Sequence, residues 1–109
     1  MTFGIKKLRE PEARDLVLQT AAHFPGHRAS TTQIKETAPK YRTMTAEDLK
    51  PSLTRANEHK WEQIIGNVTG SHQDNSTSIF KKGLATRTND GVQVTPKGIK
   101  YLTDKGFYP

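Results

Sequence analysis

The sequence contains no cysteine. Neither a disulfide nor a thiolate metal site can therefore form, and a reducing compartment is expected. No apolar run approaches the ~20 residues that a transmembrane helix needs, and the first residues lack the apolar segment of a signal peptide. These absences predict a cytoplasmic protein with no membrane partner.

Acidic residues are scarce beside basic ones, 11 against 17, which gives a formal net charge of +6 and a pI near 9.7. Such an excess favours a polyanionic partner, and nucleic acid is the commonest one. With DNA as the partner, the protein is expected to be associated with the nucleoid. Aromatic residues make up only 7% of the chain. Because most are needed for the core, a single-strand or RNA binder, which stacks bases on exposed aromatic side chains, is disfavoured.

A length of 109 residues corresponds to one domain. We expect a basic lead-in at residues 1–10, a single domain at 11–106 and a C-terminal tail at 107–109. The abrupt end after Phe107 also favours a module taken from a longer protein.

One amphipathic helix is expected from about Asn57, its candidate N-cap, to about His72. Its apolar stripe has the spacing i, i+3, i+4 and i+7 of a 3.6-residue period, and consists of Trp61, Ile64, Ile65 and Val68. The opposite face carries polar residues and two glycines, Gly66 and Gly70. Each glycine weakens a helix by roughly 1 kcal/mol relative to alanine, so their exposure on this face favours a close approach of the backbone to phosphates.

A β-hairpin is expected after this helix, with strands at 84–87 and 92–95. Asp90-Gly91 suits the tight turn, because Gly prefers the positive φ values that such turns need. Thr95-Pro96 then opens a closing helix. A helix with a polar outer face followed by a β-hairpin is the arrangement of a winged helix-turn-helix. The predicted fold is therefore α+β and helix-rich, with three to five helices, a C-terminal hairpin wing and a closing helix.

Four further helices are expected to support this unit. The first runs from about 11 to 23 and is stopped by Pro25-Gly26, and the second opens at the capping box Ser30–Gln33. The third, at 45–53, has Leu49 and Leu53 as its apolar pair; Pro51 inside it either lies early enough in the first turn to be tolerated or cuts the helix short. A half-helix at 76–82 should end at a glycine in the C′ position, residue 83.

Two stretches carry a family resemblance: Phe80–Ala85, with its Lys-Lys-Gly-Leu core, and Asp90–Leu102. The second contains a glycine, alternating apolar residues, a threonine and another glycine, in the order Gly91-Val-Gln-Val-Thr95-Pro-Lys-Gly98. Over about residues 12 to 103 the chain resembles the N-terminal winged-helix domains of Mrr-type and related modification-dependent restriction endonucleases. Relative to that pattern, residues 70–78 are an additional polar segment. The resemblance implies the DNA-reading module of a restriction or defence system, with modified bases among its candidate targets.

No nuclease motif is present in the sequence, so any cutting would belong to another domain, or to a nuclease subunit that is a candidate partner. Residues Ser71, His72 and Asp74 have the types of a catalytic triad, but neighbours in sequence cannot align as one. His23 and His27 do not share a helical face and lack a third ligand nearby. We therefore expect no enzyme activity, no metal and no cofactor.

The expected function is double-stranded DNA binding. Gln63 and Asn67 are four residues apart and would read an adenine edge in the major groove together, while wing cations would contact phosphates. His72 is either packed beside the Trp61 stripe or turned outward to a phosphate. The residues expected to contact nucleic acid are Lys60, Gln63, Asn67, Ser71, His72, Gln73, Lys81, Lys82, Arg87 and Asn89.

An alternative function is a protein-interaction or dimerisation module without DNA contact. Such a module would have an apolar outer face in place of the amides and lysines seen here. A terminal patch could serve this role instead, built from Phe3, Ile5, Phe107 and Tyr108.

Overall fold

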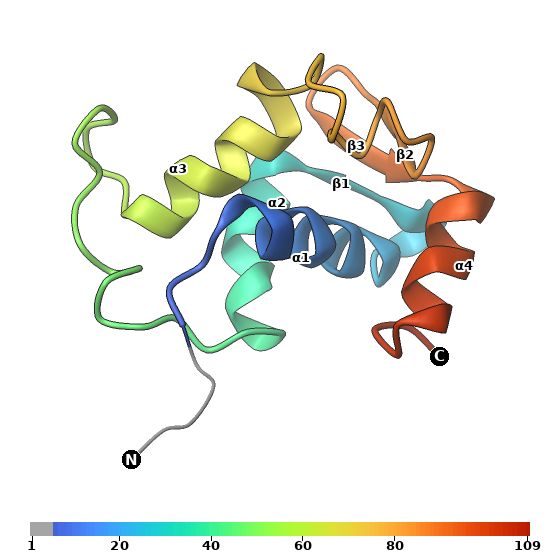
Figure 1. Ribbon diagram of the computed structural model, residues 1–109, viewed down its shortest axis with the longest axis horizontal. Coiled ribbons are helices and arrows are strands. Elements are labelled where there is room, and N and C mark those ends of the chain that lie inside the picture. Colours follow the sequence, from blue (N-terminus) through green and yellow to red (C-terminus); the bar gives the residue numbers. More distant parts are fainter. Residues whose placement is uncertain (1–5) are drawn as a thin grey trace.

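A computed structural model describes residues 6–109. The chain is organised around α1, which lies between a small sheet on one side and helices α2, α3 and α4 around it (Figure 1). The helices are α1 (Glu10–Ala22), α2 (Thr31–Thr37), α3 (Lys60–Gly66) and α4 (Pro96–Asp104), and the strands are β1 (Arg28–Ser30), β2 (Ala85–Arg87) and β3 (Gly91–Val94). Short 3₁₀ turns at Pro25–His27 and Ala38–Lys40 and a π-helical turn at Asn67–Ser71 complete the list.

The three strands form one antiparallel sheet in the order β1-β3-β2. The predicted hairpin is confirmed as β2 and β3, in which Arg87 pairs with Val92. A two- or three-stranded ribbon was expected, but the position of the third strand was not predicted: β1 has only three residues, and Ala29 pairs with Val92 from the other side. One expectation about the turn is wrong, because Gly91 does not have a positive φ. It instead lies so close to β1 that a Cβ atom would stand 2.1 Å from the Ala29 carbonyl oxygen.

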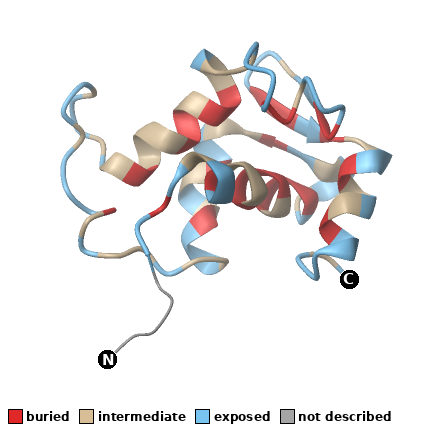
Figure 2. Ribbon diagram, in the orientation of Figure 1, coloured by how far each residue is buried: buried red, intermediate tan, exposed pale blue. Residues whose placement is uncertain are grey.

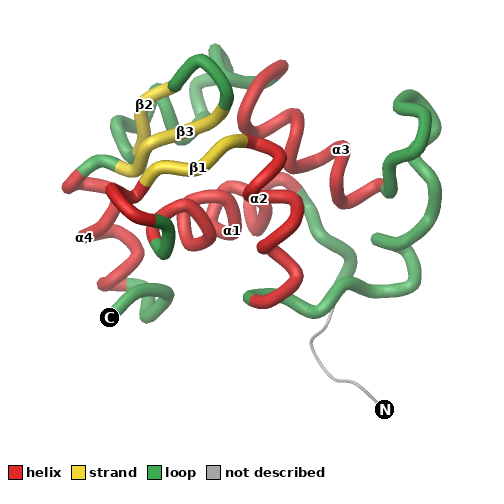
Figure 3. Tube along the Cα trace, turned by 180° about the vertical axis from the view of Figure 1, so that it is seen from behind, coloured by secondary structure: helices red, strands yellow, loops and turns green. Residues whose placement is uncertain are grey.

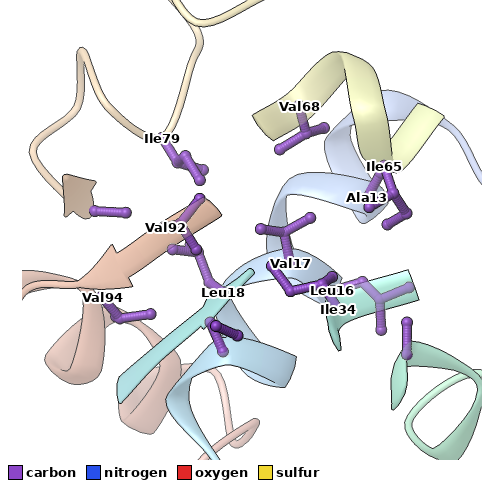
Figure 4. Packing of buried hydrophobic residues seen from close by; sticks show 14 of the residues in the cluster. Ala13, Leu16, Val17, Leu18, Ile34, Ile65, Val68, Ile79, Val92 and Val94 are labelled. Carbon is purple, nitrogen blue, oxygen red and sulfur yellow. The ribbon is translucent and has the colours of Figure 1, made fainter. Parts of the chain in front are cut away.

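The core fills the space between α1 and the sheet and continues under α3 (Figure 2). Its largest fully buried apolar side chains come from the described lead-in and from nearly every element, and they are Leu8, Val17, Leu18, Ile34, Ile65, Ile79, Val92 and Leu102. Figure 4 shows the side chains of α1 meeting those of α3 and β3. Burying each of them contributes about 1.5–3 kcal/mol. Helices too short to be stable alone, such as α2, are held by this packing.

The expected helices α1, α2 and α4 are confirmed. At the start of α2, Ser30 Oγ accepts the N–H of Gln33 at 3.0 Å, and Gln33 Oε1 accepts the N–H of Ser30 at 2.9 Å. This is the reciprocal pair of a capping box. At the start of α4, Thr95 Oγ1 accepts the N–H of Gly98 at 3.1 Å.

The predicted helix at 45–53 is wrong, because only one turn forms there. Figure 3 shows a long loop between α2 and α3. The caps exist, since Thr45 and Asp48 each accept the other's N–H, but Asp48 is buried. Pro51 lacks the N–H that a helix would use and disfavours helical geometry in the preceding residue. Leu49 and Leu53 are therefore 50% and 89% exposed instead of buried.

The predicted half-helix at 76–82 is also wrong, because the segment is a series of turns. Ser78 Oγ donates to the carbonyl of Gln73 at 2.8 Å and accepts the N–H of Lys81 at 3.0 Å. A serine side chain that bonds the backbone locally competes with helix formation. Gly83 does end the segment with a positive φ of 75°.

The apolar stripe of the central helix is confirmed: Trp61, Ile65 and Val68 are buried and Ile64 is half-buried. The proposed cap is wrong. His59 is the N-cap, its N–H donating to Glu62 Oε1 at 2.9 Å, while Asn57 has a φ of 63° in the preceding loop. No helix within residues 6–109 combines the length and the apolarity needed to cross a membrane.

Candidate nucleic-acid interface

The outer face of α3 is partly covered by the preceding loop, residues 50–59. The guanidinium of Arg55 lies against Gly66, where a Cβ atom would stand 2.7 Å from Nη1. Arg55 Nη2 also donates to Asn67 Oδ1 at 3.4 Å, and its Nη1 lies 3.8 Å from Glu58 Oε1. The expectation that Gly66 is exposed is therefore wrong. Gly70, by contrast, has open space where its side chain would be.

Gln63 is held by the same loop. Ser52 Oγ accepts the N–H groups of Thr54 and Arg55, at 3.2 and 3.0 Å. Its own hydrogen is then free to donate to Gln63 Oε1 at 2.6 Å. Both amides expected to read an adenine, Gln63 and Asn67, thus have their carbonyl oxygens engaged by residues of the loop.

Lys60, at the start of α3, is paired with a carboxylate. Its Nζ donates to Glu47 Oε2 at 2.9 Å, and Lys50 Nζ lies 3.1 Å from Glu47 Oε1. The hydrogen bond from Lys60, followed by that from Lys50, lowers the pKa of Glu47 from 4.5 to about 2. Two ammonium groups therefore share one carboxylate, and the cluster keeps a net positive charge.

The helix that begins at Lys60 continues through the π-helical turn to Ser71. Ser71 is exposed, and its Oγ donates to Asn67 Oδ1 at 3.3 Å. His72 turns toward α1, where Nδ1 lies 2.6 Å from Glu10 Oε1 and the side chain is 37% exposed. Of the two expected placements of His72, the structure has the packed one. Gln73 is half-buried in the turn that follows.

The end of this helix and the tip of the hairpin are joined through Thr31, the first residue of α2. The N–H of Thr31 donates to the carbonyl of Asp90 in the hairpin turn at 2.8 Å. Its Oγ1 donates to Thr69 Oγ1 in the π-helical turn at 3.0 Å. Thr69 Oγ1 in turn donates to the carbonyl of Ile65 at 3.2 Å. The hydroxyl group therefore competes with backbone N–H groups for a carbonyl of the helix. The outer face of the helix end and the hairpin tip therefore have a fixed relative position.

Exposed cations lie near the tip of the hairpin and around its base. Arg87 ends β2 near the tip and Asn89 lies in the turn, and both are exposed. Lys81 and Lys82 are exposed before the base of the hairpin, where Lys97 Nζ lies 3.9 Å from the Cβ position of Gly83. Within residues 6–109, four of these cations form no ion pair with a carboxylate: Lys81, Lys82, Arg87 and Lys97.

The charge balance here is uneven even in the sequence. Between residues 75 and 100 there are five basic residues and one acidic residue, Asp90. The carboxylate of Asp90 accepts a hydrogen bond from Thr88 Oγ1 at 3.2 Å within the turn. Asp90 is therefore the one carboxylate against five cations in this stretch, and the segment from 75 to 100 keeps a net positive charge.

Two arginines of this surface were not among the predicted contact residues. Arg55 was missed because it falls between the helices expected at 45–53 and from about Asn57; the glycine at 66, unexplained inside a helix, was the available signal. Arg28 was missed because β1 was not predicted. It is exposed in a row with Gln93 and Thr86 across the open face of the sheet.

Within the described part of the chain, no three His, Asp or Glu side chains are grouped closely enough to hold a metal ion. His23 and His27 contact aromatic rings instead, with His23 stacked on Tyr41 at 4.9 Å and both histidines against the edge of Tyr108. Comparison with protein-family models, with curated proteins and with solved structures finds no match to this chain.

Proposed function

We propose that the chain is a winged helix-turn-helix domain that binds double-stranded DNA. The order of elements supports this proposal, since a helix, a strand, two helices and a hairpin follow one another, with the first strand beside the last. That is the arrangement of winged helix-turn-helix domains. In this interpretation α3 with its π-helical turn is the helix that enters the major groove, and the β2–β3 hairpin is the wing beside it.

The observation that carries the proposal is the combination of unpaired cations with a fixed geometry. From Lys60 to Ser71 the helix is roughly 16 Å long, at about 1.5 Å per residue. Its far end is tied through Thr31 to the hairpin turn, beyond which Arg87 and the base lysines extend the positive surface. Such cations bind backbone phosphates and release counterions, which supplies affinity for any duplex.

The resemblance to N-terminal domains of Mrr-type and related endonucleases supports a more specific role. In that role the domain reads DNA for a restriction or defence system, and a separate nuclease domain or subunit cuts it. Recognition of a modified base would be part of the same role.

A binding panel tests the proposal directly. Fluorescence anisotropy is measured with a labelled duplex, the same duplex carrying methylated bases, and one of its single strands, each at 50 and 200 mM salt. We expect the duplexes to bind more tightly than the single strand, with affinity falling steeply as salt rises. A chain that binds no duplex at 50 mM salt is not a DNA-binding domain, and a preference for the methylated duplex would support the role in defence.

A second candidate function is a protein-docking module, favoured by the two leucines that the 45–53 segment leaves exposed. Leu53 is 89% exposed and Leu49 is 50% exposed. Large apolar side chains grouped on a surface mark interaction sites in many proteins. In the expected terminal patch, Phe107 is 36% exposed and Tyr108 is half-buried, while Phe3 and Ile5 lie outside the described residues. Sedimentation of the parent and of a Leu49→Ser, Leu53→Ser variant tests self-association through this loop.

A further inference from the structure

The guanidinium of Arg55 lies on the outer face of α3, where Gln63 and Asn67 also lie. Its guanidinium rests on Gly66, donates to Asn67 and lies beside Glu58. The side chain is 38% exposed, so part of its donor set faces solvent. Glu58 is shared with Lys35, whose Nζ lies 2.6 Å from Oε2. One carboxylate therefore serves two cations, and this face keeps a positive charge.

The hydrogen bonds fix which atoms the amides present. Arginine is only a donor, so the atom of Asn67 beside Arg55 must be its carbonyl oxygen. Ser52 Oγ already accepts two backbone N–H groups and can only donate to Gln63, which must therefore also offer its oxygen. Asn67 Oδ1 accepts from both Arg55 and Ser71, and Gln63 Oε1 is directed at Ser52, so the amino groups of the two amides remain as donors. Together with the guanidinium, they make this face a set of hydrogen-bond donors.

A set of donors does not match the major-groove edge of adenine, which needs one donor and one acceptor. It matches guanine, whose N7 and O6 are both acceptors, and arginine is the side chain that most often contacts that pair. We propose that Arg55 is the base-reading residue of this domain and that it contacts a guanine in the major groove. This inference rests on the proposed function, and it replaces the expected adenine contact of Gln63 and Asn67.

Gly66 has a defined part in this proposal. A side chain at position 66 would collide with Nη1 and Cζ of Arg55, at 2.7 and 3.2 Å. The absence of a side chain lets the guanidinium lie against the helix backbone, held by Asn67 on one side and Glu58 on the other. A side chain held in this way loses less conformational freedom when it binds. Arg55 is thus positioned for the groove before DNA arrives.

The experiment is a selection of bound duplexes from a randomised library, carried out with the parent, Arg55→Ala and Arg55→Lys. Circular dichroism and thermal melting first establish that each variant is folded. We expect the parent to enrich guanine at one position and both variants to lose that enrichment, because lysine keeps the charge but lacks the planar fork. The selected guanine is then replaced by 7-deazaguanine, which lacks the N7 acceptor.

The 7-deazaguanine duplex should bind the parent roughly 5- to 100-fold more weakly than the guanine duplex. The same replacement should change the affinity of Arg55→Ala by less than about twofold, because the variant has already lost the side chain that contacts N7. Duplex binding with no guanine preference, or with equal losses from 7-deazaguanine in the parent and in Arg55→Ala, would overturn the role of Arg55. Duplex binding with no guanine preference would leave DNA binding itself intact. If Arg55→Ala weakened binding to all duplexes alike, Arg55 would contact phosphates instead of a base, and DNA binding would again stand. Failure to bind any duplex would overturn the proposed function instead.

Discussion

Arg55 and Gly66 are complementary in shape: the guanidinium of one fills the space that a side chain on the other would need. The distance from Nη1 to the Cβ position of Gly66 is 2.7 Å. The two lie eleven positions apart in the sequence, and the loop before α3 brings them together. The pair explains why α3 carries a glycine at this position of its outer face, where Arg55 covers the helix backbone.

Replacing Gly66 with alanine should displace Arg55 without unfolding the domain. The collision is with the end of a flexible side chain, and alanine is the better helix former by up to about 1 kcal/mol. We expect the free energy of unfolding to change by less than about 1 kcal/mol while guanine preference is lost. Urea unfolding and the duplex selection measure the two effects. Gly70→Ala is the matched control, because open space surrounds that position; it should keep the preference, and equal loss in both variants would mean that Arg55 is not responsible.

Replacing Lys82 or Arg87 with alanine should weaken binding to every duplex by a similar factor. Neither side chain forms an ion pair within residues 6–109, so each is free to neutralise a phosphate. The slope of log affinity against log salt should fall by about 0.9 for each contact removed. Anisotropy titrations from 50 to 200 mM salt measure this slope. Replacing Lys40, an exposed lysine at the end of the 3₁₀ turn that follows α2, with alanine should leave the slope unchanged.

Replacing Gly91 with alanine should destabilise the fold severely. The new Cβ atom would stand 2.1 Å from the Ala29 carbonyl oxygen and 2.6 Å from Ser30 Cα, which are backbone atoms that cannot turn away. β1 would have to separate from β3, and we expect a loss of at least about 2 kcal/mol. Chemical unfolding of the variant checks this value. A loss below about 0.5 kcal/mol would mean that β1 is not packed against β3 as described.

The link between Glu47 and the start of α3 should weaken in acid. The pKa of Glu47 is lowered from 4.5 to about 2 by Lys60 and Lys50. A lowered carboxylate pKa stabilises the fold fully above the unfolded value, and this contribution disappears as pH falls from about 4.5 toward 2. The melting temperature of the parent should exceed that of Glu47→Gln at pH 7 and approach it near pH 2. Because the group is exposed to solvent, the difference should also shrink in 1 M salt. A difference that stays constant with pH would contradict the pairing.

The sequence by itself determined the elements whose signals are local. Pro11 and Pro25-Gly26, the capping box Ser30–Gln33, Thr95-Pro96 and the spacing of the Trp61 stripe depend on neighbours within a turn or two of helix. The helices α1, α2 and α4 and the buried stripe of α3 could therefore be predicted. The hairpin followed in the same way from its turn residues and alternating apolar positions. The excess of positive charge around it also belongs to the sequence alone.

Only the tertiary structure decided where the long-range contacts fall. β1 exists because β3 is beside it, and three residues carry no periodic signal of their own. The caps at Thr45 and Asp48 predicted a helix, but the burial of Asp48 and the missing N–H of Pro51 stopped it after one turn. The loop that resulted carries Arg55 onto Gly66 and engages Gln63 and Asn67. The chemical character of the proposed site therefore depends on contacts between residues 11 or 12 apart along the chain, which no pattern of neighbouring residues encodes.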